Sequence, residues 1–250
     1  FAENLEKTVE QMKNNGVAGI ITCGTTYESS ENALKMCEKF DIMYAAVGVY
    51  PHEIINSEKF DRDRFLTLLS HKKAVAVGEI GLDYFYDDTP RQMQLEWIEQ
   101  FLQLSNESGK AVTFHDRDAH ADTIQMLKKY RPQGVVHCFS GSVETAKEIL
   151  NLGMYIGIGG VVTFKNARKT VELAEMLPAD RILLETDAPF ILPYCKDVIQ
   201  PKLLRRARNT SLILPAVIKK IAELKGIPAD EVEQATTNNV IRLFRLPVNK

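Results

Sequence analysis

Acidic and imidazole side chains follow several short apolar segments of the sequence. The segment A-V-A-V-G leads to Glu79, while A-V-T-F leads to His115 and G-V-V leads to His137. A fourth segment, R-I-L-L, leads to Glu185 and Asp187. Two imidazoles and two carboxylates form a nitrogen and oxygen ligand set that suits Zn²⁺, Mn²⁺ or Mg²⁺, with Mg²⁺ least favoured by the histidines. We therefore expect Glu79, His115, His137 and Asp187 to meet around a divalent metal ion.

Each of these residues taken alone is weak evidence for a metal site. A lone buried histidine is more often a core residue with its hydrogen bonds satisfied, and a carboxylate at a strand end often caps a helix. The joint pattern is stronger, because burying an unpaired carboxylate costs several kcal/mol and a nearby cation removes that cost. Asp83, in the same segment as Glu79, leaves two interpretations open: it hydrogen-bonds a metal-ligating histidine, or it caps the next turn.

The elements that would position these residues alternate along the whole chain. Apolar runs predict strands at 17–24, 44–50, 74–79, 111–115, 134–139, 154–158 and 181–186. Helical spacing predicts helices at 1–15, 29–40, 58–71, 90–108, 119–130, 143–151, 166–176, 211–224 and from 229 to near 243. Strict alternation of this kind indicates an α/β fold with a parallel sheet covered by helices. An open doubly wound sheet and a closed TIM (β/α)8 barrel both fit, and in a barrel the carboxyl ends of the strands form one active-site face.

The composition limits the class of protein. A chain of 250 residues, 45% apolar and 26% charged, fits one large domain, which we expect to span residues 1–250. The formal charge of −2 means that any site for a polyanion must be local. No signal peptide or apolar run of membrane-spanning length is visible, and the scattered Cys23, Cys37, Cys138 and Cys195 are typical of free thiols in a reducing cytoplasm. A cytoplasmic enzyme without a membrane or protein partner is therefore expected.

Eight motifs together are similar to those of one known family. They are G-V-Y-P-H-E, G-E-I-G-L-D-Y, F-H-D-R-D-A-H, V-V-H-C-F-S-G, Y-I-G-I-G-G, L-L-E-T-D-A-P-F-I-L-P, R-N-T-S and T-T-N-N-V-I-R-L-F. In order and near spacing they resemble the TatD family of metal-dependent DNases, over essentially the whole chain. The resemblance implies an amidohydrolase-like TIM barrel whose first strand lies upstream of residue 1 and is missing or truncated here.

The resemblance also implies roles for individual residues. Glu79, His115 and His137 would bind one or two divalent metal ions, and Asp187 would bind metal and orient the attacking water. Glu185 would assist catalysis by hydrogen bonding within this site. Three residues would lie near the substrate phosphate: His52, Arg117 and Asn209.

Three departures from the family pattern concern the metal count and the substrate contacts. Most members begin with a strand ending in H-x-H, which supplies two further ligands, and no such motif precedes Phe1. Two interpretations stay open: the motif was lost with the truncated first strand, or the protein resembles the branch of the family that lacks it. Tyr50 stands where many members have histidine, and Thr210 stands where glutamate is frequent. The number of metal ions and one substrate-positioning contact therefore stay open at this stage.

The expected activity is metal-dependent hydrolysis of DNA, exonucleolytic at single-stranded ends, and the preference between DNA and RNA stays open. Two alternatives remain: a hydrolase of small esters or amides on the same barrel, and an inactive nucleic-acid-binding relative. Arg117 is either a phosphate clamp or a partner of Asp116 or Asp118. The basic run of Lys202, Arg205, Arg206 and Arg208 could meet a nucleic-acid backbone or form a solvated face. The rings of residues 84–86 could stack on unpaired bases or pack on the barrel rim.

Overall fold

A sheet of seven parallel strands in chain order forms the centre of the fold. The computed structural model describes residues 5–57, 59–86, 88–193 and 209–247. The strands are β1 (Ile20–Cys23), β2 (Met43–Val47), β3 (Ala74–Asp83), β4 (Ala111–Arg117), β5 (Gly134–Val136), β6 (Tyr155–Ile158) and β7 (Ile182–Leu184). A doubly wound sheet reverses its strand order, whereas a barrel does not. The sequential order therefore confirms the TIM-like alternative of the two predicted architectures.

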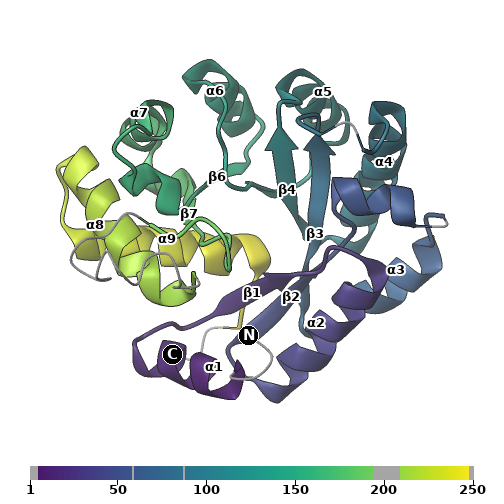
Figure 1. The fold of residues 1–250 in the computed structure, drawn as a ribbon, viewed down its shortest axis with the longest axis horizontal. Coiled ribbons are helices and arrows are strands. Elements are labelled where there is room, and N and C mark those ends of the chain that lie inside the picture. Colours follow the sequence, from purple (N-terminus) through teal and green to yellow (C-terminus); the bar gives the residue numbers. More distant parts are fainter. Residues whose placement is uncertain (1–4, 58, 87, 194–208, 248–250) are drawn as a thin grey trace.

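The helices lie mainly on the outer side of this curved sheet (Figure 1). They are α1 (Leu5–Asn14), α2 (Tyr27–Lys39), α3 (Arg62–Leu69), α4 (Arg91–Ser108), α5 (His120–Tyr130), α6 (Val143–Asn151), α7 (Arg168–Met176), α8 (Leu214–Lys225) and α9 (Ala229–Phe244). Short 3₁₀ turns are η2 (Pro51–Asn56), η3 (Gly160–Thr163), η4 (Ala179–Arg181) and η5 (Ser211–Ile213). Within the described parts of the chain, no helix has the length and apolar character needed to cross a membrane.

Two hydrophobic clusters pack against the sheet, a large one that includes residues of the surrounding helices and a smaller one that includes the end of α9. Because strand side chains alternate between faces, Val77 and Phe114 pack in the large cluster with the helices. Alternate residues such as Ala46 and Ala76 pack in a smaller cluster with the end of α9, where Leu243 and Phe244 are buried. The last helix thus fills space against the sheet face that the other helices do not cover.

The predicted elements are present, with differences at their ends. β3 continues beyond Glu79 to Asp83, whereas β5 and β7 end before His137 and Glu185. Among the described residues β1 and β7 each pair on one edge only, and the strand expected upstream of residue 1 stays a prediction. The basic run at 202–208 and Cys195 lie outside the described residues; the other three cysteines are free thiols.

A bulge and one closely packed glycine accompany the extension of β3 along β4. The register shifts between Val77 and Ile80, so that residues 78 and 79 stand opposite a single residue of β4. A bulge of this kind bends the strand and redirects a side chain, here that of Glu79. At Gly81, with φ of 151°, an added Cβ would lie 2.0 Å from the carbonyl oxygen of His115. Glycine at this position therefore lets the two strands approach where their functional side chains emerge.

Candidate metal centre

Three of the four predicted metal ligands meet at the carboxyl ends of β3, β4 and β5. One ligand atom each from Glu79, His115 and His137 lies within 4.8 Å of the other two. Oε1 of Glu79 lies 2.9 Å from Nε2 of His137 and 3.3 Å from Nδ1 of His115. The two imidazole nitrogens are 3.3 Å apart. The side chains are 11–15% exposed, so a group of one carboxylate and two imidazoles shares a small, mostly buried space.

A second carboxylate faces the far nitrogen of each imidazole. Oδ2 of Asp83 lies 3.0 Å from Nε2 of His115, and Oε2 of Glu185 lies 3.6 Å from Nδ1 of His137. Glu185 also accepts a 2.7 Å hydrogen bond from the backbone N–H of Cys138. Partners of this kind fix the tautomer and the ring orientation of a metal-ligating histidine. The geometry leaves Nδ1 of His115 and Nε2 of His137 directed into the shared space.

Asp83 satisfies both interpretations that the sequence left open. Its carboxylate is fully buried and, besides facing His115, accepts a 3.0 Å hydrogen bond from the backbone N–H of Phe85, which caps the next turn. The hydroxyl of Tyr50 donates to the same carboxylate at 3.0 Å. The side chain of Gln94 bonds the backbone of Asp83, accepting at 2.8 Å and donating at 2.9 Å. Asp83 is thus held rigidly behind the histidine.

The electrostatics of the cluster show how strongly these groups depend on one another. Burial opposes ionisation of Glu79, but His137 and His115 lower its pKa far below the usual range. Burial likewise opposes charging of the histidines, yet Glu79 with Glu185 raises the pKa of His137 and Asp83 with Glu79 raises the pKa of His115. The carboxylates therefore hold protons on the imidazoles. A divalent cation would compete for the same nitrogens, and binding it would release protons.

Asp187 lies next to this group but outside it. The ligand atoms that fall within 4.8 Å of one another do not include its carboxylate. Burial raises its pKa to about 6, with His137 opposing the shift and the charges of Glu185 and Glu79 adding to it. Its backbone adopts φ of 52°. Asp187 is therefore electrostatically coupled to the cluster, and its role as a fourth ligand stays a prediction.

His52 and Arg117, two of the predicted phosphate contacts, lie on the same rim. His52 contacts Asp88 through Nδ1, and its Nε2 lies 3.2 Å from Oδ2 of Asp83 without hydrogen-bond geometry. Arg117 is not ion-paired to Asp116 or Asp118; its guanidinium carbon lies 3.8 Å from the ring centroid of Phe85. Both side chains are near the metal cluster, and their contact with phosphate stays a prediction.

Asn209, the third predicted phosphate contact, is a buried anchor of the loop after β7. Its side-chain amide donates to the carbonyl oxygens of Thr186, Phe190 and Ile191, and the residue is fully buried. Its Oδ1 is buried without a partner in the described structure. The observed contacts give Asn209 a positioning role for the segment that includes Asp187.

Tyr50 and Gly157 contribute to the site, although no role for either followed from the sequence. Tyr50 was noted only as a departure from the family pattern, although its hydroxyl bonds Asp83 and approaches Nε2 of His115 at 3.3 Å. Gly157 leaves room for a carboxylate, because an added Cβ would lie 2.6 Å from Oε2 of Glu185. The glycine in Y-I-G-I, inside an otherwise apolar strand, was the available signal of a close approach.

The donor set fits a divalent cation. Carboxylate oxygen and imidazole nitrogen are ligands that Zn²⁺ and Mn²⁺ both accept. The histidine nitrogens facing the shared space are those left free by Asp83 and Glu185, as expected for a metal centre with supporting carboxylates. The three ligand atoms define one cation position among the described residues; whether a second ion binds stays a prediction.

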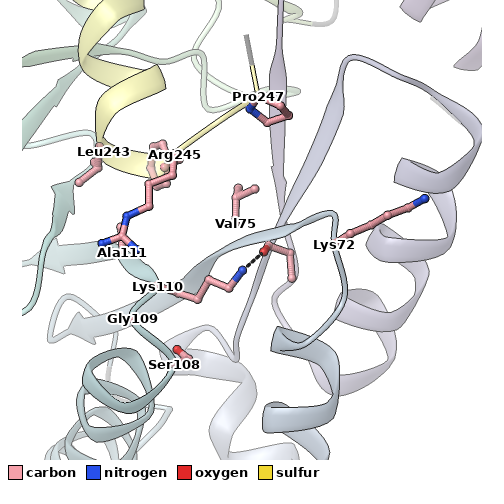
Figure 2. Close-up of a pocket in the computed structure, with 11 residues that line it drawn as sticks. Lys72, Val75, Ser108, Gly109, Lys110, Ala111, Leu243, Arg245 and Pro247 are labelled. Atoms are coloured by element: carbon pink, nitrogen blue, oxygen red, sulfur yellow. Dashed lines mark hydrogen bonds between the residues drawn. The ribbon is translucent and has the colours of Figure 1, made fainter. Parts of the chain in front are cut away.

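A separate pocket of about 200 Å³ lies at the opposite, amino-terminal end of the strands (Figure 2). Lys110 lines it and donates a 2.7 Å hydrogen bond to the carbonyl oxygen of Ala74. Arg245 caps the end of α9 close by. Cations interact favourably with the negative end of the dipole at a helix carboxyl terminus. The basic residues of this pocket therefore have a structural explanation unrelated to the metal cluster.

Comparisons with known proteins agree with this geometry. Residues 1–245 match the family model described as TatD related DNase. A Bacillus subtilis protein named "Uncharacterized metal-dependent hydrolase YabD" is 36% identical over 249 residues, covering 98% of this chain and 94% of its own length. The Klebsiella pneumoniae protein named "3'-5' ssDNA/RNA exonuclease TatD" is 34% identical, covering 100% of this chain and 95% of its own length. The crystal structure of YJJV, a TatD homologue from Escherichia coli, superposes with a TM-score of 0.89 at 32% identity, covering 99% of this chain and 94% of that one.

The fold and the side-chain cluster define a metal-dependent hydrolase on a TIM-like barrel. The chain belongs to the TatD-related DNase family. The family resemblance expected from the motifs is thus confirmed, while the assignment of individual residues rests on the geometry above.

Proposed function

We propose that the protein is a divalent-metal-dependent exonuclease that hydrolyses phosphodiester bonds at single-stranded ends of DNA and RNA. The observation that supports this most directly is the group of Glu79, His115 and His137, with a further carboxylate behind each histidine. The relatives named as single-stranded DNA and RNA exonucleases supply the substrate class. The proposal treats residues 1–250 as one catalytic barrel domain acting in the cytoplasm.

The cation would be held by Glu79, His115 and His137, with Asp187 completing the ligand set. A divalent cation at this position supplies Lewis-acid chemistry and lowers the pKa of water. With a cation bound, Asp83 and Glu185, which face the outer nitrogens, would favour the tautomer of each imidazole that offers its inner nitrogen to the centre. Mn²⁺, Mg²⁺ and Zn²⁺ are the candidate metals, with Mg²⁺ the least suited to two histidines.

Asp187 is the proposed proton acceptor for the attacking water. Its carboxylate lies beside the cluster, where the charges of His137, Glu185 and Glu79 act on it, and a general base must be within reach of the proton it takes. Asn209 holds the loop that positions Asp187. Arg117 and His52 stand on the same rim, where the guanidinium of Arg117 and an imidazole N–H of His52 would bind a phosphate oxygen of the substrate.

Cleavage assays with labelled oligonucleotides test this function. The chain is incubated with a 5′-labelled single-stranded oligonucleotide in EDTA, and then with Mn²⁺, Mg²⁺ or Zn²⁺. Progressive shortening of the label in metal, and none in EDTA, is the expected result. A circular single-stranded DNA of matched composition serves as the control, because it has no ends and should stay intact. Failure of the metal-loaded protein to shorten the linear strand would refute the proposal.

A small diester such as bis(p-nitrophenyl) phosphate provides the comparison with a less selective hydrolase. An exonuclease that recognises nucleotides should hydrolyse the oligonucleotide with a much higher kcat/KM than the small diester. Equal efficiency on both would instead favour the small-ester alternative.

A further inference from the structure

Exposed apolar side chains gather at one end of the molecule. The large hydrophobic residues that stand exposed among the described residues are Ile55 (46%), Phe85 (54%), Tyr86 (48%) and Phe190 (69%). All four follow carboxyl ends of strands: Ile55 after β2, Phe85 and Tyr86 after β3, and Phe190 after β7. Exposed apolar groups concentrated in one region usually mark a binding surface. Here that region is the rim around the metal cluster.

Phe85 and Tyr86 form a paired aromatic surface with a cation on it. Their ring centroids are 4.8 Å apart at an interplanar angle of 87°. The guanidinium carbon of Arg117 lies 3.8 Å from the centroid of Phe85 and 5.2 Å from that of Tyr86. Since Phe85 is still 54% exposed, a large part of its ring remains open to a ligand. The surface combines ring faces with a positive charge, which is the combination that binds unpaired bases beside a phosphate backbone.

A short chain of contacts joins this surface to the metal cluster. The ring of Tyr86 packs edge-on against His52 with centroids 5.1 Å apart. Nε2 of His52 lies 3.2 Å from the carboxylate of Asp83, which in turn faces His115. A base resting on Phe85 would therefore lie within a few side chains of the reacting phosphate.

Phe190 provides a second ring from another part of the rim. It belongs to the loop after β7, which β4, β5 and β6 separate from β3 in the sheet (Figure 1). Its backbone N–H donates a 2.8 Å hydrogen bond to the carbonyl oxygen of Asp187. The side-chain amide of Asn209 donates a 2.6 Å hydrogen bond to the carbonyl oxygen of Phe190. Among the described residues, the most exposed large apolar side chain is thus presented by a backbone held at both its N–H and its carbonyl group.

We propose that Phe85 and Phe190 are base-stacking residues, which grip unpaired nucleobases on two sides of the scissile phosphate and give the site its selectivity for nucleotides. This inference rests on the proposed function and specifies the residues that recognise the substrate. A paired base offers no free face to such rings, so duplex ends bind less well. A protein partner on the same rim is the competing occupant, but the guanidinium beside the rings and the adjoining metal cluster favour a phosphate-linked base.

Binding and kinetics of matched variants test the proposal. Phe85→Leu and Phe190→Leu keep an apolar side chain but remove the ring, whereas Phe85→Tyr keeps the ring and serves as the control. Binding of a labelled oligothymidylate is measured by fluorescence anisotropy in EDTA, where no cleavage occurs. Loss of one stacked base should raise the Kd about tenfold, which corresponds to about 1.4 kcal/mol, and the Tyr variant should stay close to the wild type. In Mn²⁺, the ratio of kcat/KM for the oligonucleotide to that for the small diester should fall similarly.

The outcomes separate this proposal from the function on which it rests. If the wild type cleaves oligonucleotides but both Leu variants bind them as tightly as it does, the stacking role is overturned and the nuclease function stands. If an abasic strand binds wild type as tightly as oligothymidylate, the stacking role is likewise overturned. If ring-dependent binding occurs but metal-loaded protein cleaves no oligonucleotide, the nuclease function falls and the stacking residues stand.

Discussion

Replacing Asp83 with asparagine removes the negative charge behind His115 while keeping the size of the side chain. The carboxylate has no exposed surface and accepts from Nε2 of His115, from Tyr50 and from the backbone of Phe85, each at 3.0 Å. Loss of a carboxylate that orients a ligating histidine typically weakens metal binding by about 10- to 100-fold, or about 1.4–2.8 kcal/mol. We therefore expect the Kd for Mn²⁺ to rise by that factor in Asp83→Asn.

Isothermal titration of metal-free protein with Mn²⁺ measures this change without depending on activity. Asp88→Asn is the matched control, because Asp88 contacts the other nitrogen of His52 but is 58% exposed. An exposed pair of that kind contributes only about 0–1 kcal/mol, so metal affinity should change little. Equal weakening in both variants, or unchanged affinity in Asp83→Asn, would refute the view that Asp83 acts through His115.

Three further predictions concern the centre and its loop. His137→Ala should abolish metal-dependent cleavage while the circular dichroism spectrum stays native. The control His71→Ala removes a histidine that pairs with Glu38 away from the cluster, and it should retain cleavage. Activity in His137→Ala would exclude His137 as a ligand. In metal-free protein the pKa of Asp187, raised to about 6, exceeds the unfolded value of about 3.9, so stability should fall as pH rises between these values. In EDTA, the unfolding free energy of Asp187→Asn should therefore exceed that of the wild type by about 1 kcal/mol at pH about 8, a figure reduced for solvent screening, and should equal it near pH about 4. An equal gain at both pH values would contradict the raised pKa. Asn209→Ala should lower unfolding free energy by about 1–3 kcal/mol and reduce cleavage of oligonucleotide and small diester equally, whereas a loss confined to KM for the oligonucleotide would indicate a phosphate contact.

Much of the fold followed from alternation of the sequence. Apolar runs and helical spacing located the strands and helices, because buried parallel strands and amphipathic helices have distinct patterns. The end of β3 was placed at Glu79, four residues too early, because the bulge at Gly78 and Glu79 interrupts the pattern without ending the strand. Periodicity does not reveal a bulge, since it depends on the partner strand.

The candidate site was foreseen in its residues more than in its contacts. The strand ends indicated that Glu79, His115, His137 and Asp187 would converge. The first three do, whereas Asp187 is not part of their group. Sequence alone could not choose between two functions of Asp83, because one carboxylate performs both. The burial of Asn209 was likewise invisible, because it depends on the path of the loop after β7.

If Phe85 stacks on a nucleobase as proposed, the turn after β3 links substrate recognition to metal affinity. The carboxylate of Asp83 both accepts from the backbone N–H of Phe85 and faces Nε2 of His115. A displacement of Phe85 that moves this carboxylate would therefore also move the partner of His115. If a nucleobase landing on Phe85 tightens Mn²⁺ binding by some factor, linkage requires the ion to tighten nucleobase binding by that same factor. The enzyme would then assemble its full reactivity only when ion and strand are present together.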